Sequence, residues 1–84
     1  MIDIINEIGR YKKIDLHQMS KEEARAEIMH ELFLADNFDS LVLVHGYHGG
    51  QVLKNLVRKE FEHERIERKI NLDASTTAYK LKKI

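Results

Sequence analysis

Two short polar segments carry the residue types in this chain that could do acid–base and anion chemistry. The first is Asp15-Leu16-His17, and the second is the run His45-Gly46-Tyr47-His48-Gly49-Gly50. Histidine gains and loses a proton near neutral pH, and a neighbouring carboxylate can orient it or bind a divalent metal. Glycines let the backbone approach a bound group closely. Together the two segments could hold a phosphate and move a proton beside it.

The first segment closes a predicted strand. Polar and apolar residues alternate over 12–17, which predicts a half-buried strand with Ile14 and Leu16 on one face. Asp15 and His17 then lie on the opposite face, where side chains are free to meet a ligand.

A helix is expected directly after this strand. Ser20 and Glu23 have the spacing of a capping box, in which each side chain accepts a hydrogen bond from the other residue's backbone N–H. The helix should run to about Ala35. Its expected buried stripe comprises Ala24, Ile28, Leu32 and Ala35, widened by Phe33.

The second polar segment follows another predicted strand. Residues 41–44 are continuously apolar, as in a strand buried on both faces. Apolar residues then recur at helical spacing, which predicts a second helix over about 50–62. The residues that this second helix is expected to bury are Leu53, Leu56, Val57 and Phe61. The remaining elements are a strand over 65–71, a turn over 71–75 and a last strand over 76–81.

This order, β-α-β-α-β-β, predicts an α/β fold. The first two strands should be parallel with a right-handed crossover, and the final pair antiparallel. The expected architecture is a two-layer sandwich: a mixed four-stranded sheet with two helices on one face. Residues 1–11 are interpreted as an N-terminal extension or short helix, and residues 12–84 as the domain.

Parallel strands end at the same edge of a sheet, where ligands of open α/β sheets collect. The two polar segments should therefore meet, and one crevice is expected to be lined by Asp15, His17, His45, Tyr47 and His48. The loop also leads into a helix N-terminus, which favours an anion. The plainer alternative is that its glycines only make a tight turn.

Composition limits the classes of protein. The chain has 84 residues, enough for one domain, and no cysteine, which excludes disulfides and thiolate metal sites. No secretory signal is expected from the first residues, and the run 41–44 is too short to cross a bilayer, so a cytoplasmic location is predicted. Residues 1–44 hold five Lys/Arg against nine Asp/Glu, and residues 45–84 hold nine against five. The basic second half suits a phosphate-rich partner. The alternative is that the charged residues of both halves are only solvated.

The polar segments resemble the small MutS-related (Smr) domain family. Its marks are Asp-Leu-His-Gly after the first strand and His-Gly-x-Gly-x-Gly after the second. Here they read Asp15-Leu16-His17-Gln18 and His45-Gly46-Tyr47-His48-Gly49-Gly50, so Gln18 and His48 depart from the pattern. The resemblance spans about residues 13–82. It implies a two-layer sandwich similar to the C-terminal domain of bacterial translation initiation factor three.

The resemblance implies a nicking endonuclease or a binding module for DNA or RNA, in some members at ribosomes. It makes Asp15 and His17 the expected catalytic pair and has His45 and Gly46 face the nucleic acid. On chemical grounds, His17 or His45 could act as base or acid, and Asp15 could orient one of them or bind Mg²⁺ or Mn²⁺. The phosphate is expected on Gly46, Tyr47, His48, Gly49, Gly50, Lys54 and Arg58.

Three other functions stay open from the sequence. The departures at Gln18 and His48 suit a non-catalytic DNA- or RNA-binding or ribosome-associated module. A metal-dependent hydrolase of small phosphates is also possible, in which Zn²⁺ or Mn²⁺ would be bound by Asp15, His17, His45 and His48. A partner-binding adaptor is the third alternative. DNA versus RNA and the oligomeric state are not set by these residues.

Overall fold

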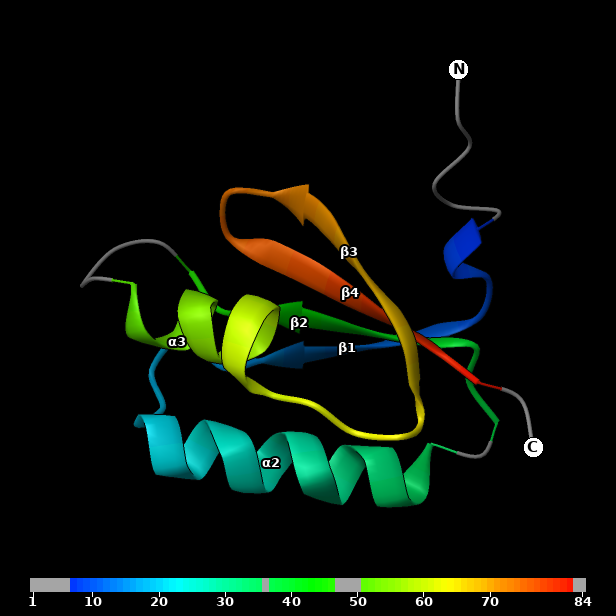
Figure 1. Ribbon diagram of the computed structural model, residues 1–84, viewed down its shortest axis with the longest axis horizontal. Helices are drawn as coiled ribbons and strands as arrows, with labels where there is room; N and C mark the ends of the chain where they lie inside the picture. The colour runs from blue at the N-terminus through cyan, green and yellow to red at the C-terminus, as the bar shows by residue number, and fades with distance from the viewer. Residues whose placement is uncertain (1–6, 36, 47–50, 83–84) are drawn as a thin grey trace.

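The computed structural model describes residues 7–35, 37–46 and 51–82, and these form a mixed sheet with two helices (Figure 1). The order of strands and helices expected from the sequence is confirmed. The strands are β1 (Tyr11–Asp15), β2 (Ser40–Val44), β3 (Ile66–Asp73) and β4 (Thr76–Leu81). The helices are α2 (Lys21–Leu34) and α3 (Val52–Asn55), and α3 continues into the π-helical turn η1 (Leu56–Glu60).

The sheet has the strand order β1-β2-β4-β3. β1 and β2 are parallel neighbours, while β4 pairs antiparallel with both β2 and β3. At one end of the sheet Asp15 is level with Val44, and Val44 with Thr76. The carboxyl ends of β1 and β2 therefore lie at the same edge, as the sequence predicted, and the start of β4 joins them there.

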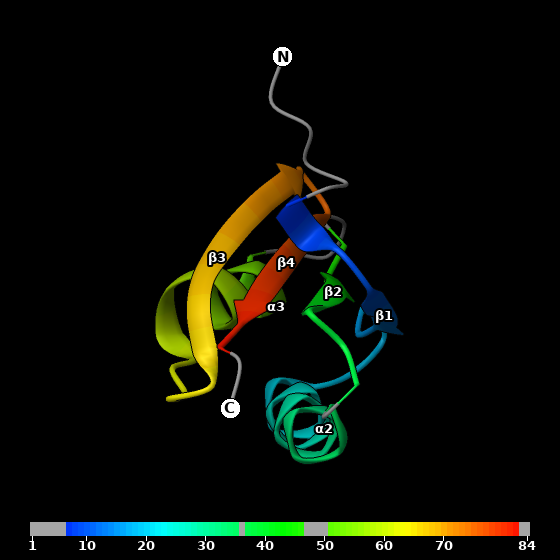
Figure 2. The same ribbon diagram turned by 90° about the vertical axis from the view of Figure 1, so that its right-hand side faces the viewer.

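Both helices cover the same face of the sheet, as Figures 1 and 2 show. The main core lies in that layer, where Ile28 and Leu32 of α2 and Val57 of η1 pack on inward-facing strand residues such as Leu43 and Tyr79. The opposite face carries a smaller apolar cluster of Val42 and Ala78 under Ile8, with Ile70 and Leu72 beside it.

The capping box of α2 forms as expected. Ser20 Oγ accepts the Glu23 N–H at 3.1 Å, and Glu23 Oε1 accepts the Ser20 N–H at 3.0 Å. The predicted stripe of Ala24, Ile28, Leu32 and Ala35 is buried. Phe33 was wrongly added to it, since this side chain is 73% exposed. Phe33 follows Leu32 by one residue and so lies about 100° around the helix, away from the sheet.

The second helix differs from the regular helix expected over 50–62. α3 has one turn, and the Phe61 N–H then bonds to the carbonyl of Leu56, five residues back, at 2.7 Å. This wide π turn adds one residue to the helical turn. It lets Leu56, Val57 and Phe61 all be buried against the sheet. Phe61 stacks on Tyr79 with ring centroids 6.1 Å apart, and the Tyr79 hydroxyl donates to the carbonyl of Val57 at 2.7 Å.

The β3–β4 hairpin is tighter than expected. The predicted turn over 71–75 was too long, because β3 continues to Asp73 and β4 begins at Thr76. The Asp73 carboxylate accepts the backbone N–H of Ser75 at 2.8 Å and its hydroxyl at 2.9 Å. These bonds close the turn without a glycine, and they also lower the pKa of Asp73.

Candidate functional site

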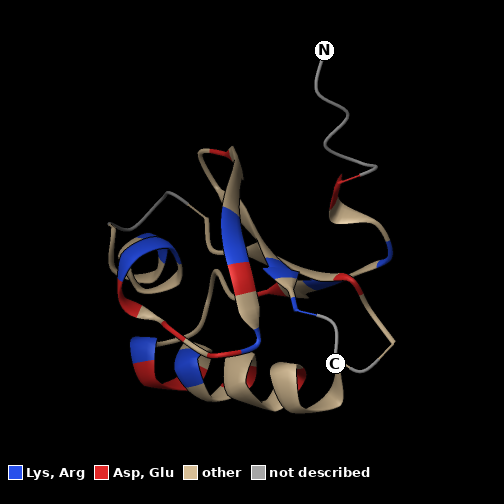
Figure 3. Cartoon of the chain, turned by 45° about the vertical axis from the view of Figure 1, so that its right-hand side comes forward, with Lys and Arg blue, Asp and Glu red and all other residues tan. Residues whose placement is uncertain are grey.

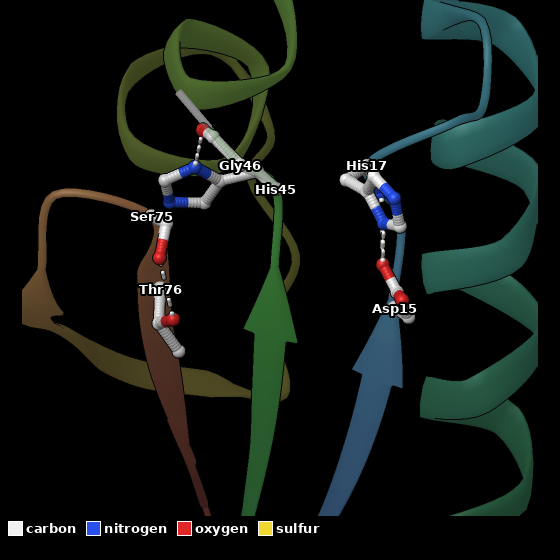
Figure 4. A network of polar contacts seen from close by, with 6 residues as sticks. All are labelled: Asp15, His17, His45, Gly46, Ser75 and Thr76. Atoms are coloured by element: carbon white, nitrogen blue, oxygen red, sulfur yellow. Dashed lines mark hydrogen bonds and ion pairs between the residues drawn. The ribbon is translucent and has the colours of Figure 1, made fainter. Parts of the chain in front are cut away.

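Asp15 and His17 form a hydrogen-bonded couple where β1 ends (Figure 4). Asp15 Oδ1 accepts the backbone N–H of His17 at 3.1 Å and also contacts Nδ1 of its imidazole. Both side chains are accessible, with exposed fractions of 48% for His17 and 60% for Asp15. The hydrogen bonds from the His17 side chain and backbone lower the pKa of Asp15, so its carboxylate stays ionised. The couple is a positioned imidazole at an open edge.

The local sequence explains this arrangement. Leu16, between the two polar residues, is fully buried, and its N–H donates to the carbonyl of Val44 at 2.8 Å. An aspartate that accepts the N–H two residues on forms an Asx turn, which closes the strand. With Leu16 anchored in the core, Asp15 and His17 must both face outward. Within the described chain, Nε2 of His17 has no hydrogen-bond partner and is the nitrogen open to a ligand.

Gly46 brings the second polar segment against the first. It has φ +75°, a region that favours glycine, and a Cβ placed there would lie 3.1 Å from Cβ of His17. The N–H groups of His45 and Gly46 both donate to the carbonyl of Ser75, at 2.9 and 3.1 Å. The start of the loop is therefore held at the carbonyl of Ser75, and Gly46 lies close to the side chain of His17.

His45 has a different environment from His17. It is 3% exposed, its Nδ1 lies 3.0 Å from the carbonyl of Gly46, and its Nε2 lies 3.0 Å from the hydroxyl of Thr77. Burial lowers the pKa of His45, and the positive charge of Arg58 adds to that shift. The neutral imidazole with its proton on Nδ1 fits both contacts, because Nδ1–H then donates to the carbonyl and Nε2 accepts from Thr77. In the structure His45 is therefore a buried residue that links the start of the loop, at Gly46, to Thr77 of β4.

Arg58 completes this buried network from the helix layer. Its Nε donates to the Thr77 hydroxyl at 2.6 Å, and its Nη2 donates to the carbonyls of Thr76, at 3.2 Å, and of Asp73. The π turn that contains Arg58 directs the guanidinium onto the β3–β4 hairpin. Arg58 thus supports His45 through the shared Thr77 hydroxyl, and its charge is not neutralised by a carboxylate in these bonds.

The structure brings together three of the residues expected at the site, namely Asp15, His17 and Gly46, with His45 directly behind them. Lys54 and Arg58 lie further away, where they line a hollow beside β3. Tyr47, His48, Gly49 and Gly50 lie outside the described residues. The catalytic and phosphate-binding roles assigned from the sequence stay predictions.

Two residues of the site escaped the sequence interpretation. Thr77 joins His45 to Arg58, and Ser75 orients the start of the loop. Both belong to β4 or its turn, whose place beside β2 depends on the strand order. A threonine in an alternating strand gives no signal of such a role.

Binding of a metal ion within the described residues would need several donor side chains close together. No three His, Cys, Asp or Glu side chains gather into such a group there. The predicted donor set includes His48, which is not described, so this finding concerns only part of that set. Within residues 7–35, 37–46 and 51–82, no helix is long and apolar enough to cross a membrane.

Comparisons with protein-family models, with curated proteins and with solved structures found no match to this chain.

Proposed function

We propose that this chain is an Smr-like nucleic-acid-binding domain that cleaves a phosphodiester bond in DNA or RNA. The observation that carries the proposal is the exposed Asp15–His17 couple at the edge of the sheet, where a Cβ added to Gly46 would lie 3.1 Å from Cβ of His17. The strand order and the helices on one face support the expected likeness to the C-terminal domain of bacterial initiation factor three.

His17 supplies the acid–base step in this proposal. Its Nε2 takes a proton from a water molecule, the water oxygen forms a bond to phosphorus, and the bond to the leaving oxygen breaks. The imidazolium returns the proton to that oxygen or to solvent. Asp15 fixes the ring through Nδ1 and stabilises the positive imidazolium, as a carboxylate beside a catalytic histidine does.

Negative charge on the phosphate oxygens has to be stabilised during cleavage by a cation near the Asp15–His17 couple. Lys13 is exposed and lies two residues before Asp15, on the same face of β1, about 7 Å along the strand. Its charge contributes to the lowered pKa of Asp15. We assign Lys13 to a non-bridging phosphate oxygen, with a divalent metal on Asp15 as the alternative source of charge.

A binding module without catalysis is the second candidate. The environment of His45 favours it, because both ring nitrogens of this buried histidine contact groups of the protein. Of the two predicted edge histidines that the structure describes, His17 is the exposed one. The metal-dependent hydrolase of small phosphates stays a hypothesis that requires His48.

The test is a cleavage and binding assay with the full chain. Supercoiled plasmid and a structured RNA are incubated with Mg²⁺, with Mn²⁺ or with chelator, using the wild type, His17→Ala and Asp15→Ala. His30→Ala is the matched control, because His30 is exposed on α2, away from the edge. The endonuclease proposal expects cleavage lost in the first two variants only. Binding without cleavage in the wild type selects the second candidate, and cleavage that survives both substitutions refutes the first.

A further inference from the structure

A basic hollow of about 460 Å³ lies between the second helix and β3. Its lining includes four cationic side chains, Lys54, Arg58, Lys59 and Lys69, and three amides, Gln51, Asn55 and Asn71. Among the described residues, no carboxylate lines it. Figure 3 shows basic positions on both elements that enclose it, the helix and β3.

The spacing of these residues explains why they meet. Lys54 and Arg58 are four residues apart on the helix, as are Asn55 and Lys59, so each pair projects from about the same side. On β3, Lys69 and Asn71 share a face because they are two residues apart. That face is the helix-bearing one, since Lys69 is level with the core residue Tyr79. The fold thus aims polar groups from two layers into one space.

The positive charge of the hollow is only partly balanced. Arg58 bonds to carbonyls and a hydroxyl, so its charge remains. Lys69 Nζ forms an ion pair with Glu62 Oε1 at 3.1 Å. The Glu62 side chain is 79% exposed, so this ion pair is weak. Lys54 and Lys59 have no ion pair with a residue that the structure describes.

We infer that this hollow binds a backbone phosphate of the nucleic acid, as a contact separate from the Asp15–His17 edge. Lysine ammonium groups and amide N–H groups suit phosphate oxygens, and such contacts fix the register of a protein on its nucleic acid. The inference rests on the proposed nucleic-acid function for its ligand, while the chemistry of the hollow, recognition of a phosphate dianion or diester, is independent of it.

The hollow and the Asp15–His17 couple lie beside opposite outer strands of the sheet. Asp15, Val44, Thr76 and Asp73 form one row across the four strands. Three strand spacings put the two outer strands about 14 Å apart, so the hollow and the couple would contact different phosphates of the nucleic acid. Arg58 also links the hollow to the edge, because it bonds to the Thr77 hydroxyl that contacts His45.

The test replaces the two lysines that have no ion pair with a described residue, in Lys54→Gln/Lys59→Gln. The matched control is Arg10→Gln/Lys82→Gln, which removes the same charge from exposed residues at the opposite end of the sheet. Binding of a labelled oligonucleotide, as DNA and as RNA, is measured from 50 to 200 mM salt. The hollow variant should bind roughly 10-fold or more weakly at 50 mM, with a log–log salt slope reduced by about 1.4 to 1.8. The control should lose clearly less.

In a second arm, the protein is titrated with inorganic phosphate and with pyrophosphate. Binding is monitored by the amide chemical shifts of residues 51–59 and 69–71. If no oligonucleotide binds the wild type, the proposed function fails, and this arm then decides the hollow alone. Shifts that disappear in the hollow variant support a site for free phosphates, although the nucleic-acid ligand is then refuted. Oligonucleotide affinity equal in the hollow variant and the control overturns the inference, and so does the absence of any response in both arms.

Discussion

Gly46→Ala tests whether the loop after β2 holds the Asp15–His17 couple in place. Gly46 has φ +75°, and an added Cβ would lie 3.1 Å from Cβ of His17. A non-glycine residue in this region costs about 1–2 kcal/mol. Alanine returns about 0.4–1 kcal/mol by narrowing the unfolded ensemble. Because the contact with His17 adds its own cost, we expect a net loss of about 1–2 kcal/mol in the free energy of unfolding.

For a domain of this size, that loss lowers Tm by roughly 5–15 °C. Part of the strain should be relieved by displacement of His17, which moves Nε2 relative to the loop. Urea denaturation measures the first effect, and the ¹H–¹³C signals of the His17 imidazole report the second. Cleavage, if present in the wild type, should fall with the displacement.

Gly9→Ala is the matched control. Gly9 also has a positive φ, of +68°, and its added Cβ would lie 2.6 Å from Oδ2 of Asp39, at the opposite end of β1. That carboxylate accepts the N–H of Arg10 at 2.9 Å, so this variant should be destabilised at least as much. The His17 signals should nevertheless stay at their wild-type positions. The reasoning is refuted if Gly46→Ala is as stable as the wild type, or if both variants perturb His17 equally.

Three further predictions concern the supports of the site. Thr77→Val removes the hydroxyl shared by His45 and Arg58, and should lower the free energy of unfolding by about 1–3 kcal/mol in urea denaturation; an unchanged midpoint would contradict the network. Burial lowers the pKa of His45, so its share of the stability is complete above its ordinary pKa of about 6.5 and is lost as pH falls through the lowered value. The free energy of unfolding should therefore decrease from pH 7 to 5, less steeply in His45→Gln, and equal slopes would argue against a buried neutral ring. Ser20→Ala removes the N-cap of α2 and should lower the free energy of unfolding by about 1 kcal/mol, measured as a lower Tm. A Tm equal to that of the wild type would contradict this prediction.

The part of the fold that positions the site was predictable because local patterns determine it. Alternation around Leu16 placed Asp15 and His17 on the outer face, and the capping box of Ser20 placed the start of α2. A single helix between two neighbouring strands returns the chain so that they run parallel, which brought Asp15 and His17 to the same edge as His45 and Gly46. These inferences need only residues that are near one another in the sequence.

The supports behind the edge were not predictable for the opposite reason. Thr77 is 32 residues from His45, and it reaches that ring only because β4 enters the sheet between β2 and β3. Arg58 is turned toward the hairpin by a π turn that forms as Phe61 packs on Tyr79. Tertiary packing decides both features, and helical periodicity of the apolar residues does not reveal them.

The rate of phosphodiester cleavage by His17→Ala, compared with His30→Ala, tests the central claim most directly. Under single-turnover conditions, on whichever substrate the wild type cleaves, loss of the acid–base group should slow cleavage by about 100-fold or more. His30→Ala should cleave at the wild-type rate, and nucleic-acid binding should be retained in both variants. Equal cleavage rates in the two variants would contradict the assignment of the Asp15–His17 couple as the catalytic site.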